Sequence, residues 1–237
     1  MIVGSESEQP VEYRQSRFRT PPGAAEILLV RHGESEPVRP DRPIPRVDGQ
    51  DDPGLAPEGR EQAERVALRL GAERVDAIYV STLRRTSQTA APLAARLGLT
   101  PVVEPALREV YLGDWEGGLF RRMVAEGHPI ARRMSDEERW DVIPGAEPAA
   151  AFSDRVREAL GKLGAAHPDQ RIVVVTHGGV IAEALAAATG SRPFAFLGAD
   201  NGSVSRLVLT DKRWILRGYN DTAHLGAGHS ATAAPLT

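Results

Sequence analysis

The sequence predicts an α/β protein: a three-layer α/β/α sandwich with a mostly parallel sheet, one antiparallel edge strand and a small helical lid subdomain. Three observations lead to this prediction. Strand-like runs of aliphatic and β-branched residues alternate with helical stretches along the chain, which is the order of βαβ units. The runs at 27–30 and 172–175 are apolar at every position, as in strands buried on both faces. Near the end, two strand-like segments follow one another with only a turn at 211–212 between them.

The first half of the chain begins with a polar stretch, residues 1–23, which shows no sustained period and is expected to be a flexible leader. The proline-rich segment at 37–53 is expected to form a long loop over the top of the sheet. The expected elements are a strand at 27–30, a helix at 58–70, a strand at 76–80, a helix at 83–97 and a short strand at 101–104.

The second half contains the predicted lid, at about 117–147, where helical signals are weaker and arginine is frequent. It is followed by a helix at 149–166, a strand at 171–176, an apolar helix at 179–189 and strands at 203–209 and 214–219. The Ala/Gly-rich tail, 226–237, is expected to be loose. Residues 24–225 are thus predicted to form one catalytic domain.

The composition narrows the possible partners. The 237 residues carry a net charge of −3, which argues against nucleic-acid or acidic-membrane binding. No run reaches the ~20 apolar residues of a membrane span. The absence of cysteine excludes disulfides, thiol catalysis and thiolate metal sites. We expect a cytoplasmic protein that acts on a small molecule; a homodimer is one of the oligomeric states that the composition allows.

Histidines follow two of the buried strands. Arg31 and His32 come directly after the first, and His177 follows the strand at 171–176. Ligands in open α/β sheets bind beyond the carboxyl ends of the strands, and neighbouring strands lie about 4.8 Å apart. If these two strands are neighbours, the two imidazoles face each other across a small anion.

A phosphoryl group is the anion that the surrounding residues suit best, because a pocket without a metal must hold it with fixed cations and donors. Arg31 offers a planar fork, and a second comes from the Arg84-Arg85 pair. Those two arginines are turned about 100° apart on a helix, so only one can enter the pocket. His177 is a third donor, and the helix that begins near Gly178 has free amide N–H groups.

The sequence also proposes the groups that react. We expect His32 to be the nucleophile, because the adjacent arginines disfavour its protonated form. Glu109, in a loop punctuated by glycine, is the best candidate for the acid that protonates the leaving group; Asp114, Glu116 and Glu34 are weaker ones. A metal between His32 and His177 is disfavoured, since the flanking arginines repel a cation.

Four motifs, in this order, resemble those of the histidine phosphatase superfamily, the phosphoglycerate mutase-like group. They are Arg31-His32-Gly33-Glu34-Ser35, Ser81-x-Leu83-x-Arg85, Leu107-Arg108-Glu109-x-x-x-Gly113-x-Trp115-Glu116-Gly117 and Thr176-His177-Gly178-Gly179. The resemblance implies that His32 becomes phosphorylated, that Arg31, Arg85 and His177 hold the phosphate, and that Glu109 is the proton donor. It also implies that no metal or other cofactor is needed.

Departures from the family pattern concern the substrate side. Val38 stands where many members have asparagine, and the following loop is longer and richer in proline. Candidate substrate contacts are Ser35, Glu34, Arg121 and Arg122, although lid arginines are more often a solvated face. Mutases of the family usually have Arg-x-Tyr-Gly and a later lysine after the acid, and this chain has neither there.

The sequence therefore predicts a metal-independent phosphomonoesterase (a hydrolase of the histidine acid phosphatase type) that cleaves a small phosphorylated metabolite through a phosphohistidine. Two alternatives stay open: a phosphoglycerate mutase-type phosphomutase, and a catalytically silent protein that binds a phosphate ligand.

Overall fold

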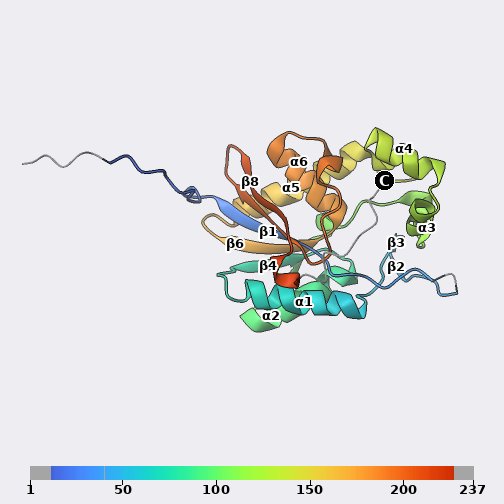
Figure 1. Cartoon of the computed structure of the whole chain (residues 1–237), viewed down its shortest axis with the longest axis horizontal. Coiled ribbons are helices and arrows are strands. Elements are labelled where there is room, and N and C mark those ends of the chain that lie inside the picture. Colours follow the sequence, from blue (N-terminus) through green and yellow to red (C-terminus); the bar gives the residue numbers. More distant parts are fainter. Residues whose placement is uncertain (1–11, 40, 227–237) are drawn as a thin grey trace, which may run out of the picture.

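A six-stranded sheet forms the centre of the computed structural model, which describes residues 12–39 and 41–226 (Figure 1). The strands lie in the order β5-β4-β6-β1-β7-β8. Their bounds are β1 (Ala25–Arg31), β4 (Ala77–Val80), β5 (Val102–Val103), β6 (Arg171–Thr176), β7 (Val204–Leu209) and β8 (Trp214–Asp221). β5, β4, β6 and β1 are parallel, β7 is antiparallel to β1, and β8 is antiparallel to β7.

The mostly parallel sheet of the sequence prediction is thus confirmed, with one correction. The antiparallel strand, β7, is not at the edge; β8 takes the edge and runs in the same direction as β1. The reason is the short turn between the two last strands, which makes them an antiparallel hairpin. One member of that hairpin must then pair with β1 and the other must lie outside it.

Helices cover both faces of the sheet (Figure 1). α1 (Pro57–Leu70) and α2 (Arg84–Leu97) lie on one face, and α5 (Ala149–Ala166) and α6 (Gly178–Thr189) on the other. The side chains of β1 alternate between the two cores: Leu28 and Val30 pack in the α1/α2 layer, Ile27 and Leu29 in the α5/α6 layer. This double burial confirms the three-layer architecture and explains why residues 27–30 of the strand are all apolar.

The predicted lid region contains two short helices, α3 (Leu119–Ala125) and α4 (Pro129–Glu137), which lie together beyond one end of the sheet in Figure 1. Aromatic side chains hold this region to the body: Trp140 packs on Phe120, at 6.0 Å between ring centroids, and on Phe194, at 5.0 Å. Several of the arginines form ion pairs on the outer surface, such as Arg133 with Glu137. Short 3₁₀ turns complete the fold: η1 (Pro105–Leu107), η2 (Gly113–Trp115), η3 (Trp140–Val142), η4 (Pro193–Phe196) and η5 (Ala223–Leu225).

The segment at 37–53, expected to be a plain loop, contains a small hairpin. β2 (Arg46–Val47) pairs antiparallel with β3 (Gln50–Asp51). Asp48 (φ 49°) and Gly49 (φ 82°) form the connection, and both have the positive φ that two-residue hairpin turns require. Strands of two residues are too short to show an alternating pattern, which is why the sequence did not predict them.

The two ends of the chain are described only in part. Residues 12–20 form no helix or strand, and residues 1–11 of the predicted leader lie outside the described residues. Of the predicted tail, 227–237 likewise lie outside them. In the part of the chain that the structure describes, no helix combines the length and apolarity that crossing a membrane requires.

Candidate active site

The pairing of β1 with β6 brings the two strand-end histidines together. Arg31 lies opposite Thr176 in the parallel register, so His32 and His177 occupy the next position on neighbouring strands. Their ring centroids are 5.2 Å apart, and the rings meet edge to face. Both side chains are buried. The geometry that the sequence predicted for the sheet edge is therefore present.

The hydrogen bonds of His32 define its tautomer. Nδ1 lies 2.7 Å from the carbonyl oxygen of Gly33, to which it donates. Nε2 accepts a hydrogen bond from the Nε–H of Arg85 across 3.2 Å, so the lone pair of the ring is on Nε2. Burial lowers the pKa of His32 well below its ordinary value, and the charges of Arg85 and Arg31 lower it further. A neutral imidazole with a fixed lone pair is a competent nucleophile.

His177 is held from below by Ser81. The Ser81 hydroxyl and Nε2 of His177 lie 2.8 Å apart and share a hydrogen bond. That Nδ1 is buried and has no hydrogen-bond partner among the described residues. Burial, followed by the charge of Arg85, lowers the pKa of His177 well below its ordinary value. If the neutral ring accepts from Ser81, its proton is on Nδ1, where it can donate to an anion.

Two arginines add positive charge beside the histidines. Arg31 donates from Nη1 to the carbonyl of Ala199, while its buried Nε has no partner in the described part of the chain. Arg85 donates from Nη1 to the carbonyl of Asp51 across 3.0 Å. Burial lowers the pKa of Arg31, and it lowers that of Arg85 to about 10, so both stay charged at neutral pH. Buried donors without acceptors, on or beside cations, are what an anion requires.

The Glu109 carboxylate is held by two backbone amides. Its Oε1 accepts from the N–H of Val110 (3.0 Å) and its Oε2 from the N–H of Gly179 (3.1 Å). In the first turn of α6, the Gly179 amide thus binds this carboxylate, and the contact of the Gly178 amide with phosphate stays a prediction. Gly178 lies against Arg31, since a Cβ added to it would lie 3.6 Å from the Nε of Arg31.

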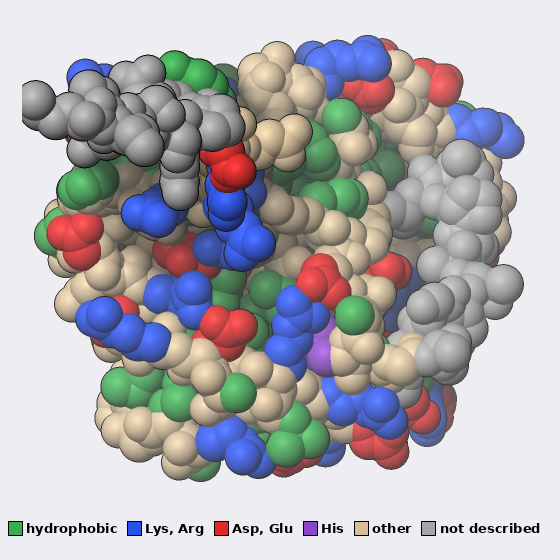
Figure 2. Space-filling view, turned by 60° about the vertical axis from the view of Figure 1, so that its left-hand side comes forward, with side chains coloured by type: hydrophobic (Ala, Val, Ile, Leu, Met, Phe, Trp, Pro, Cys, Tyr) green, Lys and Arg blue, Asp and Glu red, His purple; other side chains and the backbone are tan. Residues whose placement is uncertain are grey.

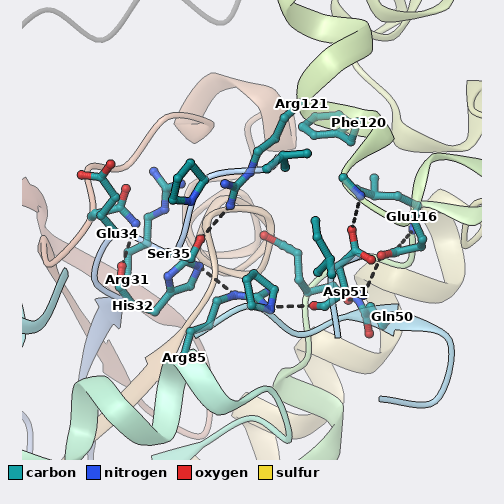
Figure 3. A pocket seen from close by; sticks show the side chains of 18 of the residues that line it. Arg31, His32, Glu34, Ser35, Gln50, Asp51, Arg85, Glu116, Phe120 and Arg121 are labelled. Carbon is teal, nitrogen blue, oxygen red and sulfur yellow. Dashed lines mark hydrogen bonds between the residues drawn. The ribbon is translucent and has the colours of Figure 1, made fainter. Parts of the chain in front are cut away.

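Arg31, His32, Arg85 and Glu109 line a cavity of about 630 Å³, drawn in Figure 3, whereas His177 is fully buried and is not among the residues that line it. One part is polar, with Arg31, His32, Arg85 and Glu109. The remainder is larger than a phosphate ion needs and includes an apolar wall formed by Val38, Ile44, Phe120 and Trp140. On the face of the molecule shown in Figure 2, acidic and basic side chains are interspersed and form no patch of a single sign.

The candidate substrate contacts divide into two groups. Glu34, Ser35 and Arg121 line the cavity, and Nη2 of Arg121 donates to the Ser35 hydroxyl across 2.7 Å (Figure 3). Arg122 is not among the residues that line the cavity; its side chain is 65% exposed and pairs with Glu126. The expectation that Arg122 contacts substrate is corrected, because neighbours on a helix point about 100° apart.

The alternative acids are placed differently from Glu109. Both oxygens of Glu116 accept backbone N–H groups, from Leu112 at 3.0 Å and from Asp51 at 2.7 Å. Burial raises the pKa of Glu116. Asp114 is not among the residues that line the cavity, whereas Glu34 is. The two arginines at the start of α2 also point in different directions, because neighbours on a helix are turned about 100° apart. Arg84 binds Asp52 at the surface, and Arg85 is buried.

Sequence reasoning missed several residues that hold the site together. Asn201 donates from Nδ2 to the carbonyl of His32 (2.8 Å), and the N–H of Gly202 donates to the carbonyl of Arg31 (3.0 Å). The Asn-Gly pair before β7 was a turn signal, but nothing local tied it to the first motif. Gln50 and Asp51 line the cavity, but no local pattern in the 37–53 segment indicated that they belong to the site. Among the described residues, no group of three or more acidic or histidine side chains is arranged to hold a metal ion.

The chain is similar to known proteins in sequence and in fold. A family model of the histidine phosphatase superfamily (branch 1) matches residues 27–222. The chain is 37% identical over 206 residues to phosphoglycerate mutase-like protein 4 of Arabidopsis thaliana, covering 85% of this chain and 87% of that protein. It is 32% identical over 203 residues to phosphoserine phosphatase 1 of Hydrogenobacter thermophilus, covering 84% and 94%. The solved structure of mycobacterial glucosyl-3-phosphoglycerate phosphatase with VO3 superposes with a TM-score of 0.69 at 32% identity, covering 83% and 99%.

Proposed function

The chain belongs to the histidine phosphatase superfamily (branch 1), and from this premise we propose that it is a metal-independent phosphomonoesterase that acts through a phosphohistidine at His32. The observation that carries the proposal is the pair of buried donors without acceptors, Nε of Arg31 and Nδ1 of His177, beside a neutral His32. Phosphatase activity is further supported by the relatives named phosphoserine phosphatase and glucosyl-3-phosphoglycerate phosphatase.

In the proposed first step, the phosphoryl group of the ester lies between His32 and Glu109. Arg31, Arg85 and His177 donate to its non-bridging oxygens, and the bond from Arg85 to Nε2 of His32 is exchanged for one to the phosphate. Nε2 attacks phosphorus, the P–O bond to the alcohol breaks, and Glu109 gives its proton to the leaving oxygen. The products of this step are the free alcohol and phosphohistidine.

In the second step, water attacks phosphorus, Glu109 takes a proton from it, and the P–N bond to His32 breaks. Inorganic phosphate then leaves and both residues return to their starting states. The substrate is a small phosphorylated metabolite, in keeping with the size of the cavity. A cytoplasmic location and a homodimer stay predictions.

Hydrolysis of p-nitrophenyl phosphate in the presence of EDTA tests the function. We expect turnover to survive chelation and to fall by roughly 10⁴-fold or more in His32→Ala, because the nucleophile is lost. An acid-labile phosphoenzyme should form on the wild type and not on the variant. Intact turnover in His32→Ala would remove this residue from the proposed role, and loss of turnover with EDTA, restored by a divalent metal, would refute metal independence.

A phosphomutase is the second candidate, because one of the similar proteins is named phosphoglycerate mutase-like. The two activities differ in where phosphohistidine delivers its phosphoryl group, to water or to a second hydroxyl of the substrate. Supplying 3-phosphoglycerate and measuring free phosphate against 2-phosphoglycerate separates them. A phosphate-binding protein without turnover would form neither product.

A further inference from the structure

Gln50 has its side-chain amide bound to the backbone of the proposed proton donor. It begins β3 and is 4% exposed. Its Nε2 donates to the carbonyl of Glu109 across 2.8 Å and to the carbonyl of Val110 across 3.1 Å. A primary amide has two N–H groups, and here both are engaged on two successive peptide units.

The backbone that carries Glu109 depends on such contacts. Residues 108–112 lie between η1 and η2 and belong to no helix or strand. Their carbonyls at 109 and 110 are therefore held by side chains and not by a regular ladder. The carbonyl of Glu109 also accepts from Nη2 of Arg155 across 2.9 Å. It is therefore bound both by Gln50 of the β2/β3 hairpin and by Arg155 of α5.

The next residue of β3, Asp51, is bonded to the arginine beside the proposed nucleophile (Figure 3). The carbonyl of Asp51 accepts from Nη1 of Arg85 across 3.0 Å, and Nε of Arg85 donates to His32. Two consecutive residues of one short strand thus connect to the proposed acid and to the proposed nucleophile. Misplacement of a reacting group by about 1 Å can reduce a rate by roughly 10²-fold.

We propose that Gln50 is a positioning residue that holds the Glu109 carboxyl where the leaving oxygen needs its proton. The inference rests on the proposed function, in which Glu109 is the acid. The effect of removing Gln50 should depend on the leaving group of the ester. A p-nitrophenolate leaves with little help from a proton, whereas an alkoxide needs full protonation, so an ill-placed acid slows alkyl esters selectively. A residue that only supports the fold would slow both alike.

The test compares kcat/KM for p-nitrophenyl phosphate and for glycerol 2-phosphate in Gln50→Met, which keeps the size of the side chain and removes the donors. This ratio covers the steps up to release of the alcohol and excludes hydrolysis of the phosphohistidine, which both esters share. We expect kcat/KM for glycerol 2-phosphate to fall by about 10²-fold and that for p-nitrophenyl phosphate by less than about threefold. Gln62→Met is the matched control. Gln62 is also buried and lines the cavity, but its Oε1 accepts from the N–H of Glu34, so any loss should be equal for both esters.

A double variant separates the inference from the function on which it rests. In Glu109→Gln, which should itself be selective, adding Gln50→Met should produce no further selective loss, since Gln50 acts through Glu109. Selective slowing by Glu109→Gln with equal slowing by Gln50→Met would overturn the role of Gln50. Equal slowing of both esters by Glu109→Gln would instead overturn Glu109 as the acid. If Gln50→Met does not fold, Gln50→Asn keeps the amide but shortens its reach, and the same selectivity is expected.

Discussion

Arg85 donates its Nε–H to Nε2 of His32 across 3.2 Å, while the other ring nitrogen of His32 donates to the carbonyl of Gly33 across 2.7 Å. The hydrogen bond from Arg85 therefore keeps the lone pair of the ring on Nε2, and the charge of Arg85 lowers the affinity of that nitrogen for a proton. When an anion enters, the guanidinium can transfer its hydrogen bond to an oxygen of the anion and release the lone pair. Before an anion binds, the imidazole is thus neutral and oriented, and its lone pair is engaged only by the hydrogen bond from Arg85.

The charge of Arg85 should be measurable in the titration of His32. Burial is the largest cause of the lowered pKa and Arg85 the second, so Arg85→Met should raise the pKa of His32 while leaving it below the ordinary value. Titration of ¹⁵N-labelled histidine between about pH 4 and about pH 8 measures this. Arg84→Met is the matched control, because Arg84 binds Asp52 at the surface. An unchanged His32 titration in Arg85→Met would contradict the expectation.

Acidification should destabilise the fold through the same histidines. The pKa values of His32 and His177 are lowered in the folded state, so the unfolded chain binds more protons below about pH 6.5. Stability is then lost as pH falls from about 6.5 toward the folded-state values, by up to about 1.4 kcal/mol per histidine and pH unit. Denaturant unfolding at several pH values measures the slope. His177→Asn should make it shallower, and an equal slope in that variant would count against the idea.

Gly179 should be essential for the position of Glu109. A Cβ at this position would lie 2.5 Å from Oε1 of Glu109, and the N–H of Gly179 already binds Oε2. Gly179→Ala should therefore lower kcat for glycerol 2-phosphate by about 10²-fold, since the carboxyl must move. Gly161→Ala, within α5, has open space around its Cβ and is the control that should leave kcat unchanged. Equal activity of the two variants would show that Glu109 tolerates the shift.

Substitution of Arg121 should change KM, whereas substitution of its neighbour Arg122 should not. Arg121 lines the cavity, and burial lowers its pKa, whereas Arg122 pairs with Glu126 on the outer surface. Removing the cavity cation in Arg121→Met should raise KM for an anionic ester by about tenfold, the equivalent of one charge-assisted hydrogen bond, with little change in kcat. Arg122→Met should leave both constants unchanged. Equal effects of the two substitutions would argue against a substrate contact by Arg121.

Much of the fold could be predicted because its signals are local. The apolar run of β1 is followed by Arg31 and that of β6 by Thr176 and His177, and α5 shows its stripe of apolar residues over its full length. Glycine also marks the ends of α2 and α6, where Gly98 and Gly190 adopt the left-handed conformation. The hairpin of β2 and β3 carried no comparable signal, because two residues cannot display a period.

The sequence by itself determined which strands are buried and which side chains stand at their ends. Apolar runs and the residues that end them can be recognised from neighbouring residues alone. This was enough to bring Arg31, His32 and His177 to one sheet edge. Only the tertiary structure decided which groups hold them. The contact of Gln50 with Glu109 spans 59 residues, and that of Asn201 with His32 spans 169. Such contacts depend on the packing of all the elements between them, so no local pattern specifies them.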